Sequence, residues 1–553
     1  MTGAIQTLLL LLVILVIVDV AAQRLHLARS ILLVVAGIAL AVVPGLPHVR
    51  IAPEFMLLVV LPPLIYTAGV QMSWREFRFN LRPISLLAIG SVVFTACAVA
   101  LAAHALLGIE WAVGFVLGAI VAPPDLVAPL AIARGVRMPR RLLVILEGEG
   151  LANDATALIL YRFAVAAVST GVFSLGRAAE VFGLIVVGEL IYGTAVGWAS
   201  LHLRRWARNP RVEITISLIT PYVSYWLPEH LGGSGVLATV ACGLYVSWNG
   251  PLLISSATRL QGIFFWDFIV YLIEGLVFLL MGLQLRTLLL ELDASMISQL
   301  ITATAITTAI VIVARFVWMF PATYLPRWLS PSLARRDPSP PWQYPFALAF
   351  TGVRGVVSLS AAFAIPLTTA DFLPFPDREL ILFVTFGVIL ITLVGQGLAL
   401  PSVFRWLGLD RIGVEENRQE QASELAARNE ALELAQRRLD QIAAERNLPD
   451  DVLAQLRARH YDRAQQLPKD LGGGVELTRS GADIRLELID AEREHLSRLL
   501  REGKLTDESR RRIERELDLE EATISSLKER QLTSKEELAP PHRRARRKHQ
   551  SAQ

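Results

Sequence analysis

Long apolar runs, separated by short polar segments, fill the chain as far as about residue 410. A helix needs about 20 mainly apolar residues to cross the hydrocarbon layer of a membrane. By that measure the pattern predicts thirteen spans and an all-α membrane protein. The predicted spans cover residues 3–22, 30–46, 51–70, 84–107, 111–132, 142–168, 180–203, 213–227, 233–248, 263–285, 298–323, 344–366 and 379–405.

The last part of the chain has a different pattern. Residues 411–553 are rich in Arg, Glu, Asp and Gln, and none of their apolar runs is long enough to span a membrane. Leu425, Leu432 and Leu439 recur every seven residues, which indicates a helix with one apolar seam. We therefore expect a transmembrane domain over residues 1–410 and a helical tail over residues 411–553.

Arginine placement orients the predicted spans. Within the membrane domain, seventeen arginines lie in connections that follow odd-numbered spans, and four lie in connections that follow even-numbered spans. Positively charged connections are retained in the cytoplasm. The bias therefore places the N-terminus outside the cell and the tail in the cytoplasm, which requires an odd number of spans.

Composition narrows the class of protein. The chain is 53% hydrophobic, which is too apolar for an ordinary soluble protein of this length. Its two cysteines, Cys97 and Cys242, both lie in apolar runs, so we expect small core residues and no disulfide framework. No glycine-lysine loop of the nucleotide-binding type is visible, so an ion gradient is the expected energy source.

Helix-breaking residues interrupt two of the spans. Pro123 and Pro124 remove two backbone donors from the fifth span, so that helix has to break. Gly352 and Gly355 flank a buried charge, Arg354, in the twelfth span. Broken spans at corresponding positions of two halves point to a transporter site. Since these spans are seven apart, we expect two inverted six-span repeats with one span between them.

Polar residues inside the sixth span carry the candidate chemistry. A carboxylate in the bilayer costs about 2.5–3.5 kcal/mol on insertion scales, so it is rare without a function. Carboxylate, amide and main-chain oxygens bind small cations, and burial favours the protonated form of a carboxylate. We expect Asp154 and Asn153 to bind the cation, with Asp154 alternating between cation and proton. Glu149, which shares a helix face with Asn153, and Asp125 in the fifth span are further candidates for the cation and proton site.

Each acid also has a structural interpretation. Glu149 can instead pair with one of three arginines expected inside the membrane, Arg162, Arg315 or Arg354. Glu147 lies near the predicted cytoplasmic end of its span, where it can be an interfacial carboxylate. Asp154 is less open to this interpretation, because it lies beside an amide and opposite a double-proline break.

Two further acids remain. Breaking two helices inside the membrane leaves two partly positive and two partly negative helix ends. Asp125 in one break and Arg354 in the other would offset these ends, at a position that the ion has to pass. Glu274 in the tenth span has no obvious partner, and it can either line an entry path or pair with Arg315.

The motifs together carry a family resemblance. In six segments of the membrane domain the chain resembles the bacterial sodium/proton exchangers of the monovalent cation:proton antiporter-1 family. The resemblance implies a homodimer of thirteen-span subunits in which the fifth and twelfth spans cross as broken helices. The matching segments are Leu61 to Gly69, Ala122 to Ala128, Gly148 to Asp154, Phe278 to Leu283, Ala314-Arg315 and Gly352 to Gly355.

The resemblance also implies roles for single residues. Asp154 matches the family's essential carboxylate, and Asn153 matches the adjacent amide. Glu149 matches the family's upstream acid, and Asp125 matches the acid of the span-five break. Arg315 and Arg354 match two family arginines, either of which can pair with Glu149.

Two departures from the family pattern leave the preferred cation open. Pro124 stands where relatives often have Thr, and Gly150 stands where they often have Ser, so two hydroxyl ligands are missing. Main-chain carbonyls or water would have to replace them.

The sequence therefore predicts a secondary-active antiporter of the inner cell membrane, exchanging cytosolic Na⁺ for external H⁺ in pH and sodium homeostasis. Asn153 cannot titrate, so one carboxylate cycles between one cation and one proton, and the exchange should be electroneutral. We expect no cofactor besides the transported ions, and no nucleic-acid partner. The alternatives are K⁺/H⁺ exchange by the same architecture, a membrane sensor that signals through the tail, and a channel.

Overall fold

The computed structural model describes residues 2–25, 28–43, 55–125, 127–136, 138–171, 174–290, 297–369, 372–446 and 449–465, with short stretches between residues 485 and 524. The secondary structure of these residues is helical, apart from one isolated bridge between Thr368 and Pro374. The prediction of an all-α protein is therefore confirmed. The chain forms two compact units, Met1–Gly413 and Val414–Gln553.

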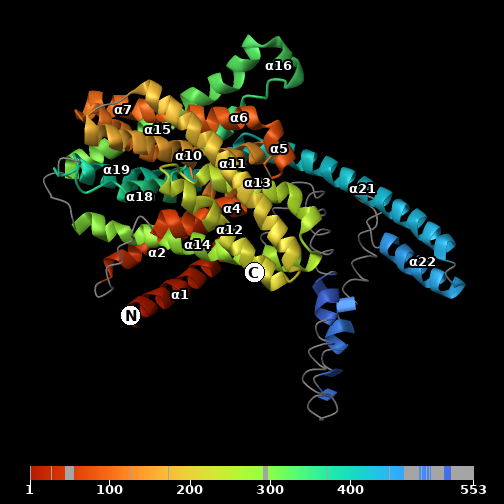
Figure 1. The fold of residues 1–553 in the computed structure, drawn as a ribbon. Helices are drawn as coiled ribbons and strands as arrows, with labels where there is room; N and C mark the ends of the chain where they lie inside the picture. The colour runs from red at the N-terminus through yellow and green to blue at the C-terminus, as the bar shows by residue number, and fades with distance from the viewer. Residues whose placement is uncertain are drawn as a thin grey trace. The chain divides into compact units, whose positions relative to one another are not determined.

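The first unit is a succession of helices interrupted by two extended breaks (Figure 1). Before the first break lie α1 (Thr2–Leu25), α2 (Arg29–Val42), η1 (Met56–Val60), α4 (Leu61–Gln71), α5 (Trp74–Phe79), α6 (Leu81–Ser85), η2 (Leu86–Ser91), α7 (Val92–Leu107) and α8 (Trp111–Val121). Between the breaks lie α9 (Val127–Val136), α10 (Arg140–Thr170), α11 (Leu175–Ala207), α12 (Pro210–His230), α13 (Val236–Leu253), α14 (Ser256–Leu290), α15 (Ile297–Leu329), α16 (Pro331–Arg336) and α17 (Gln343–Phe350). After the second break come α18 (Val356–Phe363), α19 (Arg378–Ile391), η4 (Thr392–Gln396) and α20 (Gly397–Trp406).

Eight of the described helices are long and apolar enough to cross a membrane. Six of them lie in α1, α10, α11, α13, α14 and α15, and the other two are the continuous helices Leu81–Leu107 and Arg378–Trp406. Shorter apolar helices cover Arg29–Val42, Met56–Gln71 and Trp111–Val121. The eighth and twelfth predicted spans overlap α12 and the pair α17 and α18. Each predicted span thus overlaps a helix, while the count of thirteen stays a prediction.

Helix α10 lies between two groups of helices. In one group, α7 packs against α8 and α15, and α15 packs against α17 and α19. In the other group, α11 packs against α12 and α13, and α13 packs against α4. Helix α10 contacts α8 of the first group, η2, which packs against α7 and α15 of that group, and α13 of the second (Figure 1). Helix α10 therefore has neighbours in both groups.

The two breaks meet in space. Helix α8 ends at Val121, and the chain runs without helix through Pro123 and Pro124 before α9 begins. Helix α17 ends at Phe350, and residues 351–355 are again non-helical. The backbone N–H of Asp125 donates to the carbonyl of Val353 at 2.7 Å, which ties one break directly to the other. Backbone groups that leave a helix inside a membrane need such partners.

The tail contains two long described helices, α21 (Leu409–Arg446) and α22 (Asp450–Gln465). Leu425, Leu432 and Leu439 are half-buried on α21. An ion pair between Arg457 and Asp440, at 2.8 Å, links α22 to α21. Ion pairs this exposed contribute little stability, so this pair adds little to the packing of α22 on α21.

Candidate ion-binding site

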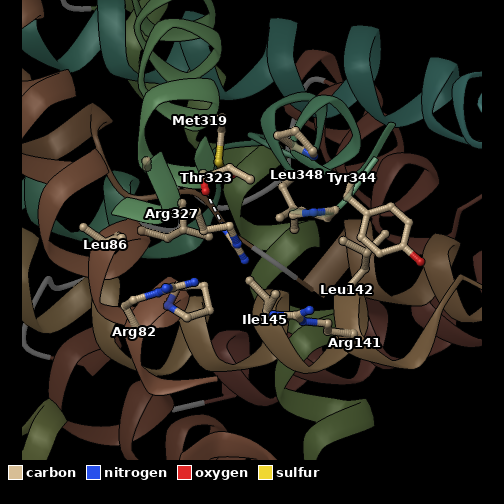
Figure 2. Close-up of a pocket in the computed structure, with 15 residues that line it drawn as sticks. Arg82, Leu86, Arg141, Leu142, Ile145, Met319, Thr323, Arg327, Tyr344 and Leu348 are labelled. Carbon is tan, nitrogen blue, oxygen red and sulfur yellow. Dashed lines mark hydrogen bonds between the residues drawn. The ribbon is translucent and has the colours of Figure 1, made fainter. Parts of the chain in front are cut away.

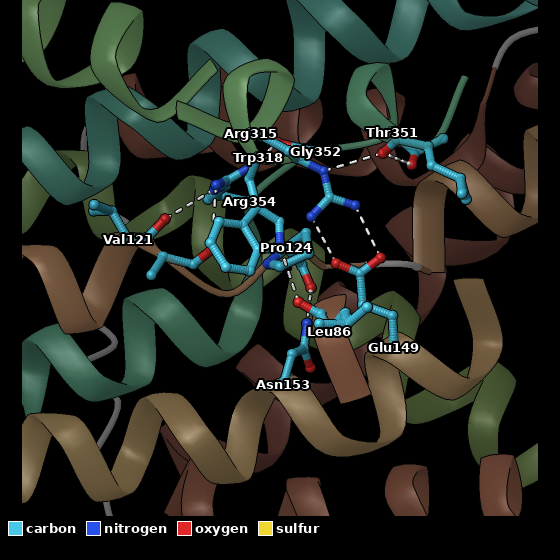
Figure 3. Close-up of polar contacts among 12 residues, drawn as sticks. Leu86, Val121, Pro124, Glu149, Asn153, Arg315, Trp318, Thr351, Gly352 and Arg354 are labelled. Atoms are coloured by element: carbon cyan, nitrogen blue, oxygen red, sulfur yellow. Dashed lines mark hydrogen bonds and ion pairs between the residues drawn. The ribbon is translucent and has the colours of Figure 1, made fainter. Parts of the chain in front are cut away.

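Asn153 connects α10 to the first break. The side chain of Asn153 is fully buried, and its Nδ2 donates to the carbonyl of Pro124 at 2.8 Å (Figure 3). The Oδ1 of the same amide is buried and has no hydrogen-bond partner among the described residues. An unpaired buried acceptor is costly, and it is the type of atom that a cation binds.

Asp154 follows directly on α10. Its carboxylate is half-buried and has no hydrogen-bond or ion-pair partner within the described part of the chain. It lies within electrostatic range of Asp125. Leaving a carboxylate without a partner in apolar surroundings is costly, and a bound proton or cation lowers that cost.

Asp125 accepts hydrogen bonds from two helix N-termini. Its Oδ1 accepts from the backbone N–H of Val127 at 3.0 Å, at the start of α9. Its Oδ2 accepts from the backbone N–H of Val356 at 3.4 Å, at the start of α18. The N-terminus of a helix carries partial positive charge, so the carboxylate stabilises both ends. A Cβ built on Gly355 would overlap this carboxylate, which explains why the break has a glycine there.

Arg354 has the complementary role at helix C-termini. Its guanidinium is 1% exposed and donates Nε to the carbonyl of Val121 at 2.8 Å and Nη2 to that of Ala122 at 3.2 Å (Figure 3). It also donates to the carbonyl of Gly352 in its own break. Its backbone N–H donates to Thr392 Oγ1 at 3.0 Å, which anchors the break to η4. Asp125 and Arg354 thus lie where opposite helix ends need opposite charges.

Glu149 forms a buried ion pair with Arg315. The two carboxylate oxygens accept from Nη1 and Nη2 at 2.6 and 2.9 Å, and the side chains are 0% and 1% exposed (Figure 3). Arg315 Nε donates to the carbonyl of Leu348 at 3.1 Å. The pair therefore joins α10, α15 and α17. Of the three arginines that sequence analysis left open, Arg315 is the partner of Glu149, and Arg162 pairs with Glu229 on α12.

Two predicted acids remain, Glu274 and Glu147. The bonds of the Arg315 guanidinium described above go to Glu149 and to Leu348, and a pair between Glu274 and Arg315 stays a prediction. Glu274 is half-buried on α14, and its role along an entry path stays a prediction. Glu147 is half-buried on α10, toward the Arg140 end.

Sequence analysis did not single out Glu189 or Glu229, two acids that the fold places against other helices. Glu189 on α11 is 4% exposed and accepts from the backbone N–H groups of Ser234 at 2.6 Å and Gly235 at 3.2 Å, just before α13. Glu229 near the end of α12 pairs with Arg162 of α10. The signal for Glu189 was available, because it is an acid inside a predicted span. Glu229 lies beyond the predicted eighth span, so only the fold reveals its partner.

Few charged ligands surround Asp154 and Asn153. The structure contains no group of three or more His, Cys, Asp or Glu side chains that could hold a metal, within the residues it describes. What it offers here is the Asp154 carboxylate, the amide oxygen of Asn153 and, in the neighbouring break, the carbonyl of Pro124. Such oxygens at a broken helix are suited to Na⁺ or H⁺. Asp154 and Asn153, the predicted ligands, are therefore adjacent and available.

Comparison with known proteins gives a family match. The profile of the transmembrane sodium/hydrogen exchanger family matches residues 8–406. An uncharacterized Na⁺/H⁺ exchanger of Mycobacterium tuberculosis is 33% identical over 522 residues, which cover 92% of this chain and 94% of the relative. The Na⁺/H⁺ antiporter ApNhaP of Aphanothece halophytica is 32% identical over 73% of this chain and 74% of its own.

Other similarities extend the comparison. A sodium, potassium, lithium and rubidium/H⁺ antiporter of Bacillus subtilis is 34% identical over 66% of this chain and 56% of its own. The sodium proton antiporter MjNhaP1 of Methanocaldococcus jannaschii shares the fold, with a TM-score of 0.53 and 18% identity over 73% of this chain and 97% of that chain.

Proposed function

This chain belongs to the sodium/hydrogen exchanger family, and on that premise we propose that it exchanges Na⁺ for H⁺ at Asp154. One arrangement carries the proposal. A carboxylate without a partner among the described residues lies beside a buried amide oxygen without one, where two broken helices meet. Both atoms are acceptors, so a cation or a proton satisfies them and a further protein acceptor does not.

The charged residues around Asp154 are engaged with other protein groups, so they do not compete with Asp154 for a cation or a proton. Glu149 is neutralised by Arg315, and Asp125 is engaged by the N-terminal N–H groups of α9 and α18. Asp154 is therefore the acid that exchanges ligands. A bare carboxylate is costly to move through an apolar environment. Transfer across the membrane is then favourable only with Na⁺ or H⁺ bound, which couples the two fluxes.

The identity of the cation is part of the proposal. Pro124 and Gly150 supply no hydroxyl ligand, and the Pro124 carbonyl already accepts from Asn153. With few fixed ligands, selectivity among Na⁺, K⁺ and Li⁺ should be modest. The names of relatives span both a Na⁺/H⁺ antiporter and one that carries four alkali cations. We propose Na⁺ as the main substrate and K⁺ as the alternative.

Membrane placement completes the proposal. The arginine bias supports an external N-terminus and a cytoplasmic tail, and the bacterial relatives support an inner membrane. We also propose a homodimer, as the family resemblance implies. The membrane unit would carry out exchange, and the tail would adjust it.

The test is a dequenching assay in everted membrane vesicles. A proton gradient is imposed, and Na⁺, K⁺ or Li⁺ is added in turn. If the protein is an antiporter, protons should move when the cation is added, and this movement should be abolished in the Asp154→Asn variant. Cation current without proton movement would instead indicate a channel. Normal insertion without any flux would favour the sensor.

A further inference from the structure

Three arginines converge on one carboxylate at the connection between α15 and α17. Arg82 Nη2 and Arg327 Nη2 lie 2.7 and 2.8 Å from Asp337 Oδ2, and Arg141 Nη2 lies 2.8 Å from Oδ1. Arg327 Nε also donates to the backbone carbonyl of Asp337 at 3.0 Å. Three positive charges against one negative charge leave two positive charges in this cluster.

Within the described residues, the ion pairs of Arg82, Arg141 and Arg327 all go to Asp337. Glu76, on the preceding helix α5, forms a bidentate pair with Arg140 at 2.7 and 3.1 Å. Arg335 and Arg336 end α16 immediately before Asp337 and add further positive charge. Burial alone raises the pKa of the Asp337 carboxyl, but hydrogen bonding and the charges of Arg141, Arg327 and Arg82 hold this pKa below its ordinary value.

The cluster opens on a cavity of about 40 Å³, lined by the three arginines, by Thr323 and Tyr344, and by apolar side chains (Figure 2). One water needs roughly 10–15 Å³ by the same measure, so the cavity can hold a small group of atoms. Arg327 points between Arg82 and Arg141. Its three nitrogens are occupied by Asp337 and the Thr323 carbonyl.

One nitrogen of the Arg82 guanidinium is not engaged by Asp337. Its Nη1 is buried and has no hydrogen-bond partner among the described residues. A buried guanidinium N–H without an acceptor is costly, so its position calls for an anion or a polar oxygen. The guanidinium fork suits the oxygens of phosphate and carboxylate, and phosphate carries more charge to offset the cluster.

We propose that Arg82 and Arg141 bind a phosphate group, with the apolar wall formed by residues such as Leu86, Ile145 and Met319 contacting the rest of the ligand. The arginine-rich connections face the cytoplasm in the orientation proposed above. The phosphate can therefore come from an anionic lipid of the inner leaflet or from a soluble phosphate compound. The ligand would fasten α6, α10 and α15 together at the end of α10 that precedes Glu149 and Asp154.

The experiment measures binding with the purified full-length protein. Thermal unfolding is followed against inorganic phosphate, with chloride at equal ionic strength as the reference. A second series adds phosphatidylglycerol or phosphatidylcholine to the detergent micelles. We expect a saturable rise in Tm with phosphate or with phosphatidylglycerol, and none with chloride or phosphatidylcholine. A response to phosphatidylglycerol alone identifies a lipid headgroup, and a response to phosphate alone identifies a soluble ligand.

Variants separate binding from a structural role. Arg82→Gln and Arg82→Lys should weaken the apparent affinity about tenfold or more, because both lose the fork, while Arg82→Lys keeps the charge beside Asp337. Arg78→Gln is the matched control, since Arg78 is exposed on the neighbouring α5. The proposal is overturned if neither probe raises Tm in the native chain, or if Arg82→Lys responds as the native chain does. These readouts involve no transport, so they stand apart from the test of antiport.

Discussion

The Cα of Gly355 faces the carboxylate of Asp125 so closely that a methyl group on it would overlap Oδ2. This carboxylate accepts from the first N–H groups of both α9 and α18. The break in one helix therefore leaves space for the acid of the other. A side chain at position 355 has to push Asp125 away from one of its two helix ends.

Gly355→Ala should accordingly lose both stability and exchange. Displacing Asp125 removes a helix cap, which typically costs about 0.5–2 kcal/mol of stability. It also leaves the Asp125 carboxylate without a partner near Asp154. The measurement is Tm in detergent together with Na⁺-driven proton flux in vesicles. Gly188→Ala on α11 is the control, because nothing lies within 4 Å of a Cβ at that position. Equal Tm and flux in both variants would contradict the packing described.

Asp154→Asn should abolish exchange while leaving the protein folded. The change removes the titratable group and keeps the size of the side chain. Flux is measured with Na⁺ and with K⁺, and insertion is checked by size-exclusion chromatography. Asp267→Asn, an exposed acid on α14, is the matched control and should transport normally. Strong Na⁺-driven proton movement in Asp154→Asn would rule out the proposed mechanism.

The Glu149–Arg315 pair should behave as a structural pair. Removing one partner of a buried ion pair typically costs about 3–5 kcal/mol, because the other charge is left unpaired. Glu149→Ala and Arg315→Ala should each lower Tm strongly. The variant that carries both substitutions should lose less free energy of unfolding than the sum of the two single losses. If Glu149 were a cation ligand instead, its loss would change the apparent Na⁺ affinity and leave Tm unaltered.

The Arg162–Glu229 pair should influence the rate of transport. It joins α10, which carries Asp154, to α12 of the other helix group. Movement of α10 against α12 requires this pair to break. Glu229→Gln should change the turnover rate about two- to fivefold, as expected for a partly exposed pair worth ~0.4–1 kcal/mol. The charge exchange Arg162→Glu with Glu229→Arg should restore the original rate, and failure to do so would separate the pair from the transport step.

Exchange should be electroneutral. Asn153 cannot titrate and Glu149 is held by Arg315, so one carboxylate carries one Na⁺ or one H⁺. A membrane potential, worth about 2.3 kcal/mol per charge at 100 mV, should then leave the Na⁺/H⁺ equilibrium unchanged. The measurement uses liposomes with the potential set by K⁺ and valinomycin, provided that K⁺ is not transported. A shift of the equilibrium with potential would require a second proton.

Local rules were enough to predict much of this molecule. Two adjacent prolines and two glycines around an arginine each violate helix chemistry, so the breaks at Pro123–Pro124 and Gly352–Gly355 could be predicted without coordinates. The acids of the sixth span were visible for the same reason, because apolar surroundings make each carboxylate conspicuous. Such signals depend on one residue and its immediate neighbours.

Pairings between distant residues could not be predicted in the same way. Glu149 and Arg315 are 166 positions apart, and Arg162 and Arg354 were equally plausible partners until the packing of α10, α15 and α17 was known. The Arg82–Asp337 contact joins residues 255 positions apart, and both lie outside the spans that the sequence predicts. Charge and spacing identify the members of such pairs, but only the fold determines which members meet.

The link between the two breaks also has a consequence for biosynthesis. Asp125 and Asn153 are made early, whereas Val353, Arg354 and Gly355 are made some 200 residues later. Because chains fold from the N-terminus during synthesis, the first half has to enter the membrane with the carbonyls of Val121 and Ala122 still lacking Arg354. The ion site is thus assembled only when the second half arrives. A ribosome that stalls before residue 351 would leave an inserted protein without a working site.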